Sequence, residues 1–217
     1  MNVEADPRGR EELARLGVPR VPAVTLGERA VGGWNPAGYA ALLGVRHVPP
    51  AVLSPAALAT RLDRVLGATQ QLLAPLDARH LDYTPPERDR PLRDLGYHVF
   101  RLALAFVDGM DMGELPERWL QERAPADLRD GAAVARYGAL VRGRIGGWFE
   151  GATEREFTRV IRVPYGPQSG HELLERTTWH AAQHLRQLHV LVPRLGVPPV
   201  PLPVDAFAGL PLPDALW

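Results

Sequence analysis

Two histidines, His180 and His184, have the residue type and spacing that point most directly to chemistry. They lie four positions apart in the segment RTTWHAAQHLRQL, and on a helix such a pair projects from one face, about one turn apart. Two imidazoles in that arrangement can bind the same metal ion. Because such a pair also arises by chance on a solvated helix face, the spacing alone leaves a metal-free helix open as an alternative.

A third ligand of the same type is available from another helix. His98 stands in the middle of the otherwise apolar segment DLGYHVFRL, and facing helices pack about 8–10 Å apart, a gap that inward-pointing histidines and a metal can fill. His171 and His189 each lie nine positions from His180, half a rotation away, and are poor ligands for the same site. The predicted metal ligands are therefore His98, His180 and His184; three histidines with open positions suit zinc, nickel or ferrous iron, without selecting one.

Three polar residues stand one helical turn from these ligands or close to them. Gln187 follows the histidine pair and could hydrogen-bond a ligand or a bound water, and Asp94 precedes His98 and could orient its free ring nitrogen. Arg176 precedes His180 and could meet a substrate carboxylate. Each of the three could equally be an ordinary surface residue, with Asp94 and Arg176 in plain salt bridges.

The composition excludes several other chemistries. The 217 residues contain no cysteine and no lysine, which excludes disulfides, Cys-ligated zinc, iron–sulfur clusters, Schiff-base chemistry and a P-loop lysine. The 25 arginines balance 25 acidic residues, so we expect neither a nucleic-acid partner nor an anionic membrane partner, which both require a basic excess. The start of the chain lacks a signal-peptide core and no apolar run approaches the roughly 20 residues of a membrane span, which predicts a cytoplasmic protein.

Four long helical segments are expected to position the histidines. Apolar residues at three- and four-residue steps and capping signals predict helices over 54–75, from 91 onward, 130–149 and 169–192, a set typical of a four-helix bundle. The β-branched segment 157–166 predicts an extended or hairpin arm. Residues 1–45 predict the order helix, strand, strand, helix, residues 46–53 a linker, residues 54–196 the bundle, and the proline-rich residues 197–217 an extended tail.

On these residues, the segment 54–196 resembles the DinB-like superfamily of metalloproteins. The similarity lies in His98 and in the W-H-x3-H arrangement of Trp179, His180 and His184, in the contexts PLRDLGYHVFRL and ERTTWHAAQHLRQL. The resemblance implies a mainly α fold with an up-and-down four-helix bundle, often dimeric, in which three histidines hold a divalent metal. Characterised relatives include thiol S-transferases and isomerases that use bacillithiol, mycothiol or glutathione, where the metal holds the incoming thiol as thiolate.

The first 45 residues resemble the second half of a glutaredoxin-type thioredoxin fold. VPRVPAV is similar to the loop that carries the family's usually cis proline, here Pro22, and GGWNPAGYAALLG to the final turn and helix. The resemblance implies thiol-binding roles for Val21, Pro22, Trp34 and Asn35. The first strand, the first helix and the Cys-x-x-Cys are missing, so this segment cannot be an oxidoreductase. Either a complete domain begins upstream, or this α/β half-thioredoxin-fold segment serves as a packing or docking element.

Three functions are compatible with the sequence. The first is a metal-dependent transferase in which an external low-molecular-weight thiol, ionised by the metal, attacks an electrophile. The second is a non-catalytic metal-binding stress-response or sensor protein with a closed coordination shell. The third is a metal-free bundle with buried, hydrogen-bonded histidines. A hydrolase using metal-bound water is a variant of the first. The predicted partners are a small-molecule thiol, an electrophile and a second copy of the chain.

Overall fold

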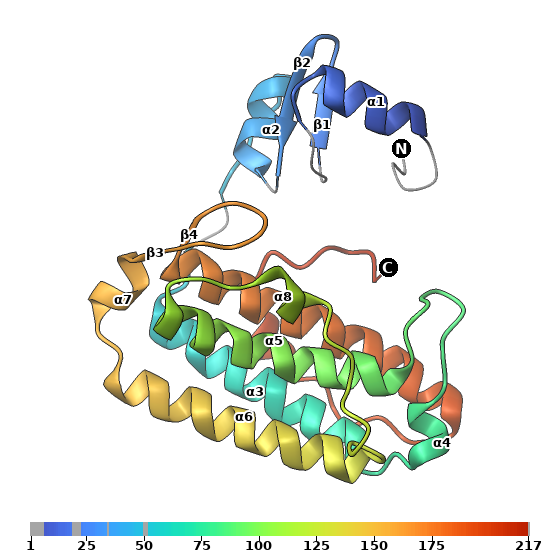
Figure 1. The fold of residues 1–217 in the computed structure, drawn as a ribbon. Coiled ribbons are helices and arrows are strands. Elements are labelled where there is room, and N and C mark those ends of the chain that lie inside the picture. Colours follow the sequence, from blue (N-terminus) through green and yellow to red (C-terminus); the bar gives the residue numbers. More distant parts are fainter. Residues whose placement is uncertain (1–6, 19–22, 34, 50–51, 217) are drawn as a thin grey trace. The chain divides into compact units, whose positions relative to one another are not determined.

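The chain divides into two compact units, residues 1–51 and 52–217. The structure is a computed structural model and describes residues 7–18, 23–33, 35–49 and 52–216. The predicted order of helix, strand, strand and helix is confirmed in the first unit. Its elements are α1 (Pro7–Arg15), β1 (Ala23–Leu26), β2 (Arg29–Gly32) and α2 (Pro36–Leu43) (Figure 1).

The two strands of the first unit form an antiparallel hairpin. Leu26 pairs with Arg29 at its closed end, and Gly27 turns the chain there with a φ of +57°, a conformation that glycine adopts at no steric cost. Helix α2 begins with Asn35, whose side chain accepts a hydrogen bond of 2.8 Å from the backbone N–H of Gly38.

The thiol-binding roles predicted for the first unit stay predictions. Val21, Pro22 and Trp34 lie outside the described residues. Asn35 is described, and its side-chain oxygen caps α2. The thioredoxin-like ancestry of the hairpin and its helices likewise stays a prediction.

The second unit is built on four long helices, each of which begins within one residue of its predicted start. Ser54, Asp130 and Ser169 each accept a hydrogen bond from the backbone N–H three residues further along the chain, which satisfies an otherwise unpaired donor of the first turn. The helices are α3 (Pro55–Leu73), α5 (Leu92–Met112), α6 (Gly131–Gly151) and α8 (Gly170–Leu191).

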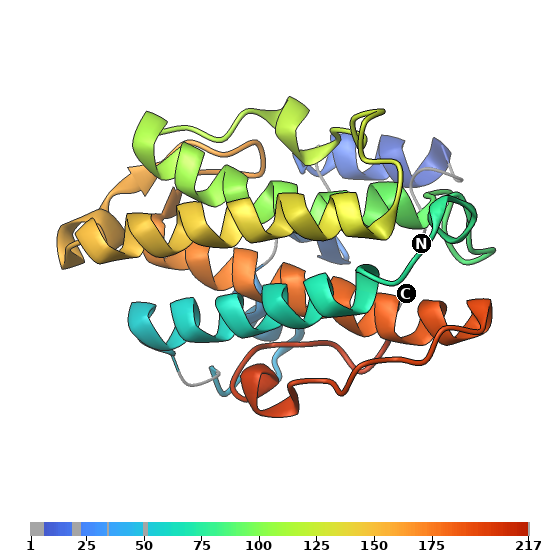
Figure 2. The same cartoon turned by 90° about the horizontal axis from the view of Figure 1, so that it is seen from below.

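These helices form the predicted mainly α four-helix bundle around one apolar core. Helix α3 packs against α6 and α8, and α5 packs against the same two helices, so α3 and α5 lie diagonally across the core (Figure 1). The directions differ from the simple up-and-down alternation expected, because α5 and α6 run parallel (Figure 2). The physical reason is the long connection 113–130, which carries the chain back along the bundle before α6 begins.

Shorter elements connect the helices. They are α4 (Ala78–Leu81), η1 (Glu117–Leu120), α7 (Glu154–Thr158), β3 (Val160–Ile161), β4 (Gln168–Ser169), η2 (Val192–Leu195) and η3 (Val204–Phe207). The arm expected over 157–166 is corrected in part, because a capping box between Thr153 and Glu156 starts a helical turn there. The hairpin begins only at β3, which pairs with β4. No helix in the described part of the chain is long and apolar enough to cross a bilayer.

The proline-rich C-terminal segment lies along α3 and α8 (Figure 2). Asp205 forms an ion pair with Arg64 of α3. The backbone carbonyl of Pro211 accepts a hydrogen bond of 2.7 Å from the indole of Trp179 on α8. Side chains of both helices thus bind the segment, and it reaches the helix that carries two of the predicted metal ligands.

The glycines of α6 lead to a stability prediction. A Cβ on Gly138 would lie 2.5 Å from Cζ of Phe100, whereas a Cβ on Gly143 would meet nothing within 4 Å. We expect Gly138→Ala to lower the free energy of unfolding by about 1–3 kcal/mol, because the Phe100 ring is fully buried. We expect Gly143→Ala to raise it by about 0.5–1 kcal/mol through helix propensity. Urea unfolding followed by circular dichroism checks both values, and shifts of equal sign would contradict the packing.

Candidate metal centre

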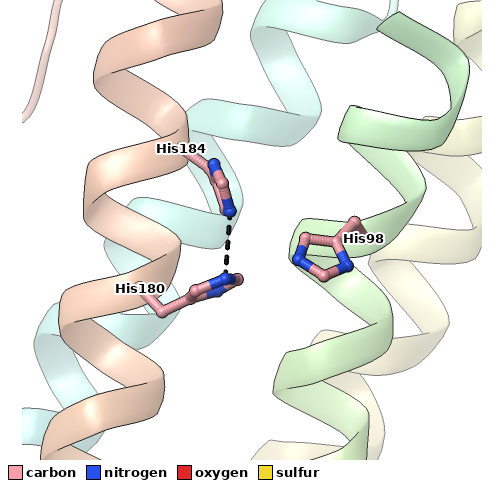
Figure 3. Close-up of side chains that lie close together, drawn as sticks. All are labelled: His98, His180 and His184. Atoms are coloured by element: carbon pink, nitrogen blue, oxygen red, sulfur yellow. Dashed lines mark hydrogen bonds between the residues drawn. The ribbon is translucent and has the colours of Figure 1, made fainter. Parts of the chain in front are cut away.

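The three predicted ligands meet between two facing helices. His98 comes from α5, and His180 and His184 come from successive turns of α8 (Figure 3). The ring centroid of His98 lies 5.0 Å from that of His180 and 5.3 Å from that of His184. One ring nitrogen of each histidine lies within 4.8 Å of the other two, a spacing within which a single ion could be held.

All three histidines are electrically neutral at neutral pH. His98 and His184 are only 5% and 4% exposed, and this burial is the main cause that lowers the pKa of His98 to about 2 and that of His184 to about 4. Burial, followed by the charges of its neighbours, also holds the pKa of His180 well below its usual range. A neutral imidazole is the form that binds a metal. The three imidazoles can therefore bind an ion without first releasing a proton from a charged ring.

Gln187 fixes which nitrogen of His184 faces the other two rings. The Oε1 of Gln187 lies 2.7 Å from Nδ1 of His184 and also accepts a hydrogen bond of 2.9 Å from Arg88. Because an amide oxygen only accepts, Nδ1 of His184 carries the proton and Nε2 keeps its lone pair. This Nε2 lies 3.0 Å from Nε2 of His180 (Figure 3). The hydrogen bond predicted between Gln187 and one of these histidines is therefore present, and the role of the histidines as metal ligands stays a prediction.

The C-terminal segment orients Gln187 in turn. The amide Nε2 of Gln187 donates to the backbone carbonyl of Leu216 at 2.5 Å, which requires the opposite side of the amide, Oε1, to face His184 and Arg88. Leu216 lies 29 residues beyond Gln187 and Arg88 lies 99 residues before it. Sequence analysis missed both partners, because they lie in irregular segments whose position no periodicity reports.

Asp94, His171 and His189 lie outside the cluster of three histidines. The Oδ1 of Asp94 accepts a hydrogen bond of 2.9 Å from the backbone N–H of Ala124, so Asp94 holds the 113–130 connection; the orienting role toward His98 stays a prediction. A nitrogen of His171 lies 2.8 Å from the backbone oxygen of Leu53. Within the described residues, Nδ1 of His189 is buried without a hydrogen-bond partner.

A cavity of about 210 Å³ opens beside the triad. His98 and His180 form one part of its wall, and four leucines form an apolar part. Two of these, Leu115 and Leu120, come from the 113–130 connection. The connection that sets the helix order therefore also forms part of the cavity wall.

Arg176 lines the same cavity. Its guanidinium lies 3.9 Å from the ring centroid of Tyr165, which stands in the loop between β3 and β4 and also lines the cavity, as does Thr177. The predicted place of Arg176 near the histidines is therefore observed. Tyr165 was missed, because nothing in the local pattern relates the hairpin loop to α8.

Comparison with known proteins identifies related sequences and folds. A family model described as the DinB superfamily matches residues 61–188. A DinB-like protein of Bacillus subtilis, YjoA, is 19% identical, with a TM-score of 0.55 over 67% of this chain and 96% of that one. YfiT from Bacillus subtilis, described as a probable metal-dependent hydrolase with an unusual four-helix bundle topology, is 17% identical, with a TM-score of 0.54 over 70% and 95%. No curated protein matches the chain.

Proposed function

Since the chain belongs to the DinB superfamily, we propose that His98, His180 and His184 bind one divalent metal ion that activates a small nucleophile for attack on an electrophile in the adjoining cavity. The observation that carries this proposal is the cavity itself, which has two of the three histidines in its wall. A closed coordination shell, as in a purely structural or sensing metal site, would leave no such room beside the ligands.

The residues present fit a metal of this kind. Three neutral imidazoles within reach of one another form a donor set that suits zinc, nickel or ferrous iron. When bound, the ion would supply a positive charge that lowers the pKa of a thiol or water beside it. Gln187 holds the proton on Nδ1 of His184 and thereby keeps Nε2 available as a ligand.

The nucleophile that we propose is a low-molecular-weight thiol, and the reaction is its S-transfer to an electrophile. The chain has no cysteine of its own, so a thiol must enter from outside. The apolar leucines of the cavity would exclude water from the reacting groups and favour the thiolate over competing hydrolysis. Bacillithiol, mycothiol and glutathione are the thiols to compare.

Hydrolysis is the second candidate. It is favoured by one specific observation, the fold similarity to YfiT, whose description is that of a probable metal-dependent hydrolase. In that case a water molecule would occupy the position proposed for the thiol, and His98, His180 and His184 would keep the same roles.

The first test is the metal content of untagged protein purified without added metal or chelator, measured by mass spectrometry. We expect about one equivalent of zinc, nickel or iron per chain. The loaded protein is then incubated with each thiol and 1-chloro-2,4-dinitrobenzene, and separately with p-nitrophenyl esters in the absence of thiol. Turnover that needs both metal and thiol supports S-transfer, turnover of the ester alone supports hydrolysis, and a protein that takes up none of the three metals contradicts both.

The role of Gln187 gives a further prediction with a matched control one turn earlier on α8. The side-chain amide of Gln183 also donates to the C-terminal segment, to the backbone oxygens of Ala215 at 3.1 Å and Leu216 at 3.0 Å. Of the two glutamines, only Gln187 forms a hydrogen bond with His184. We expect Gln187→Met to weaken metal binding about 10–100-fold and Gln183→Met to leave it unchanged. Competition with a chromogenic chelator measures both constants; equal losses would show that the C-terminal segment, rather than the hydrogen bond to His184, governs affinity.

A further inference from the structure

We propose that Arg176 binds the carboxylate of a small substrate that has a short apolar body and occupies the cavity beside the three histidines. This inference rests on the proposed function, because it places the reacting end of the same substrate at the triad. It adds the substrate class, a small carboxylate, and the residue that recognises it.

The first observation is that Arg176 has no acidic partner. Within the described part of the chain, no carboxylate oxygen lies within ion-pair distance of its guanidinium, whereas Arg142 and Arg144 pair with Asp63 and Asp111. Glu172, one turn before Arg176 on α8, turns instead to Ser169 and completes the capping box of the helix. The guanidinium of Arg176 rests on the ring of Tyr165, a contact that orients the charge but does not neutralise it.

The second observation is the charge of the cavity. Its wall contains Arg176 and no aspartate or glutamate. A divalent ion bound at the triad would add further positive charge. A partly buried cation without an acidic partner is costly unless an anion accompanies the ligand. The cavity therefore favours an anionic occupant.

The chemistry of a guanidinium narrows the anion. Its planar N–H groups match the two oxygens of a carboxylate and can donate two parallel hydrogen bonds. Phosphate would satisfy the same donors, but a small cavity of about 210 Å³ with a wall of leucines suits a ligand that is mostly apolar. A short-chain carboxylate meets both conditions.

The position of Arg176 on α8 sets the length of the substrate. Arg176 and His180 are four residues apart, so their Cβ atoms lie about 5–6 Å from each other on one face of the helix. A carboxylate held by Arg176 and a reacting atom at the triad are thus separated by a short spacer. The apolar part of the spacer would lie over the leucines Leu102, Leu115, Leu120 and Leu173.

The carboxylate could belong to the thiol or to the electrophile, and paired probes distinguish these sources. The thiol pair is 3-mercaptopropionate and 2-mercaptoethanol, and the electrophile pair is iodoacetate and iodoacetamide, each pair differing in the carboxylate. If Arg176→Met removes a rate preference for the carboxylate member of one pair, that partner carries the group. If the wild-type protein shows no preference in either pair, the proposal is overturned.

The decisive test measures binding rather than turnover, and it uses protein with and without metal. Isothermal titration with hexanoate and with hexan-1-ol compares the wild type, Arg176→Met and Arg186→Met. Arg186 is the matched control because it also lies on α8 but donates to the carbonyl of Pro213 in the C-terminal segment. We expect Arg176→Met to weaken hexanoate binding about 10–100-fold and to leave hexan-1-ol binding, the metal content and the thermal midpoint unchanged.

Two results would overturn this assignment. One is equal affinity of the wild type and Arg176→Met for hexanoate, and the other is equal affinity of the wild type for hexanoate and hexan-1-ol. Because the metal-free protein is titrated as well, the test separates this inference from the proposed function. A protein that binds hexanoate through Arg176 but takes up no metal would contradict only the latter.

Discussion

Replacing His184 with alanine is expected to reduce metal affinity by more than about 100-fold, while replacing His189 leaves it unchanged. This loss of metal affinity is expected to exceed that of Gln187→Met, because His184→Ala removes a metal ligand, whereas Gln187→Met removes only a hydrogen bond to that ligand. His189 lies nine positions from His180, half a turn around α8, and does not belong to the cluster of ring nitrogens. Metal content after equilibrium dialysis, measured by mass spectrometry, gives both results.

The pair of variants also separates folding from binding. His184 is buried and His189 is half-buried, so each alanine removes packed atoms and lowers stability, with the larger loss expected for His184. Circular dichroism of both variants establishes that they are folded at the temperature of dialysis. Equal metal content in the two folded variants would contradict the assignment of the ligands.

The metal-free protein is expected to lose stability as the pH falls below about 6.5. The pKa of His98 is lowered to about 2 and that of His184 to about 4 in the folded state, whereas an unfolded chain binds these protons near pH 6.5. Below that value the unfolded state holds more protons, so acid favours it. Each such histidine lowers the free energy of unfolding by about 1.4 kcal/mol per pH unit until its folded-state pKa is reached.

The variant His98→Leu tests this dependence. It removes one buried imidazole, so the slope of the free energy of unfolding between pH 6 and pH 4 should decrease by about 1.4 kcal/mol per unit. Urea unfolding of the metal-free wild type and variant, at several pH values, provides the slopes. Parallel curves would show that His98 becomes protonated in the folded protein. Loading the wild type with metal should shift the fall in stability to lower pH, since an ion that binds only the folded state adds to the free energy of unfolding wherever it stays bound.

Sequence alone identified the parts of the site that are governed by local rules. A capping residue acts on N–H groups within its own first turn, which is why the capping box at Ser169 predicted the start of the last long helix. The four-residue spacing of His180 and His184 dictates a common face once their segment is helical. The apolar surroundings of His98 indicated a buried position, and it is 5% exposed.

Tertiary structure alone decided the order of the helices and the partners of the site. The parallel run of α5 and α6, the contact of Arg88 and Leu216 with Gln187, and the place of Tyr165 beside Arg176 all depend on connecting segments. Asp94, one turn from His98 in sequence, bonds Ala124 of such a segment. Connecting segments lack a hydrophobic period, and their paths depend on which helix faces pack together. A contact such as that of Arg88 with Gln187, 99 positions apart, therefore follows only from the assembled bundle.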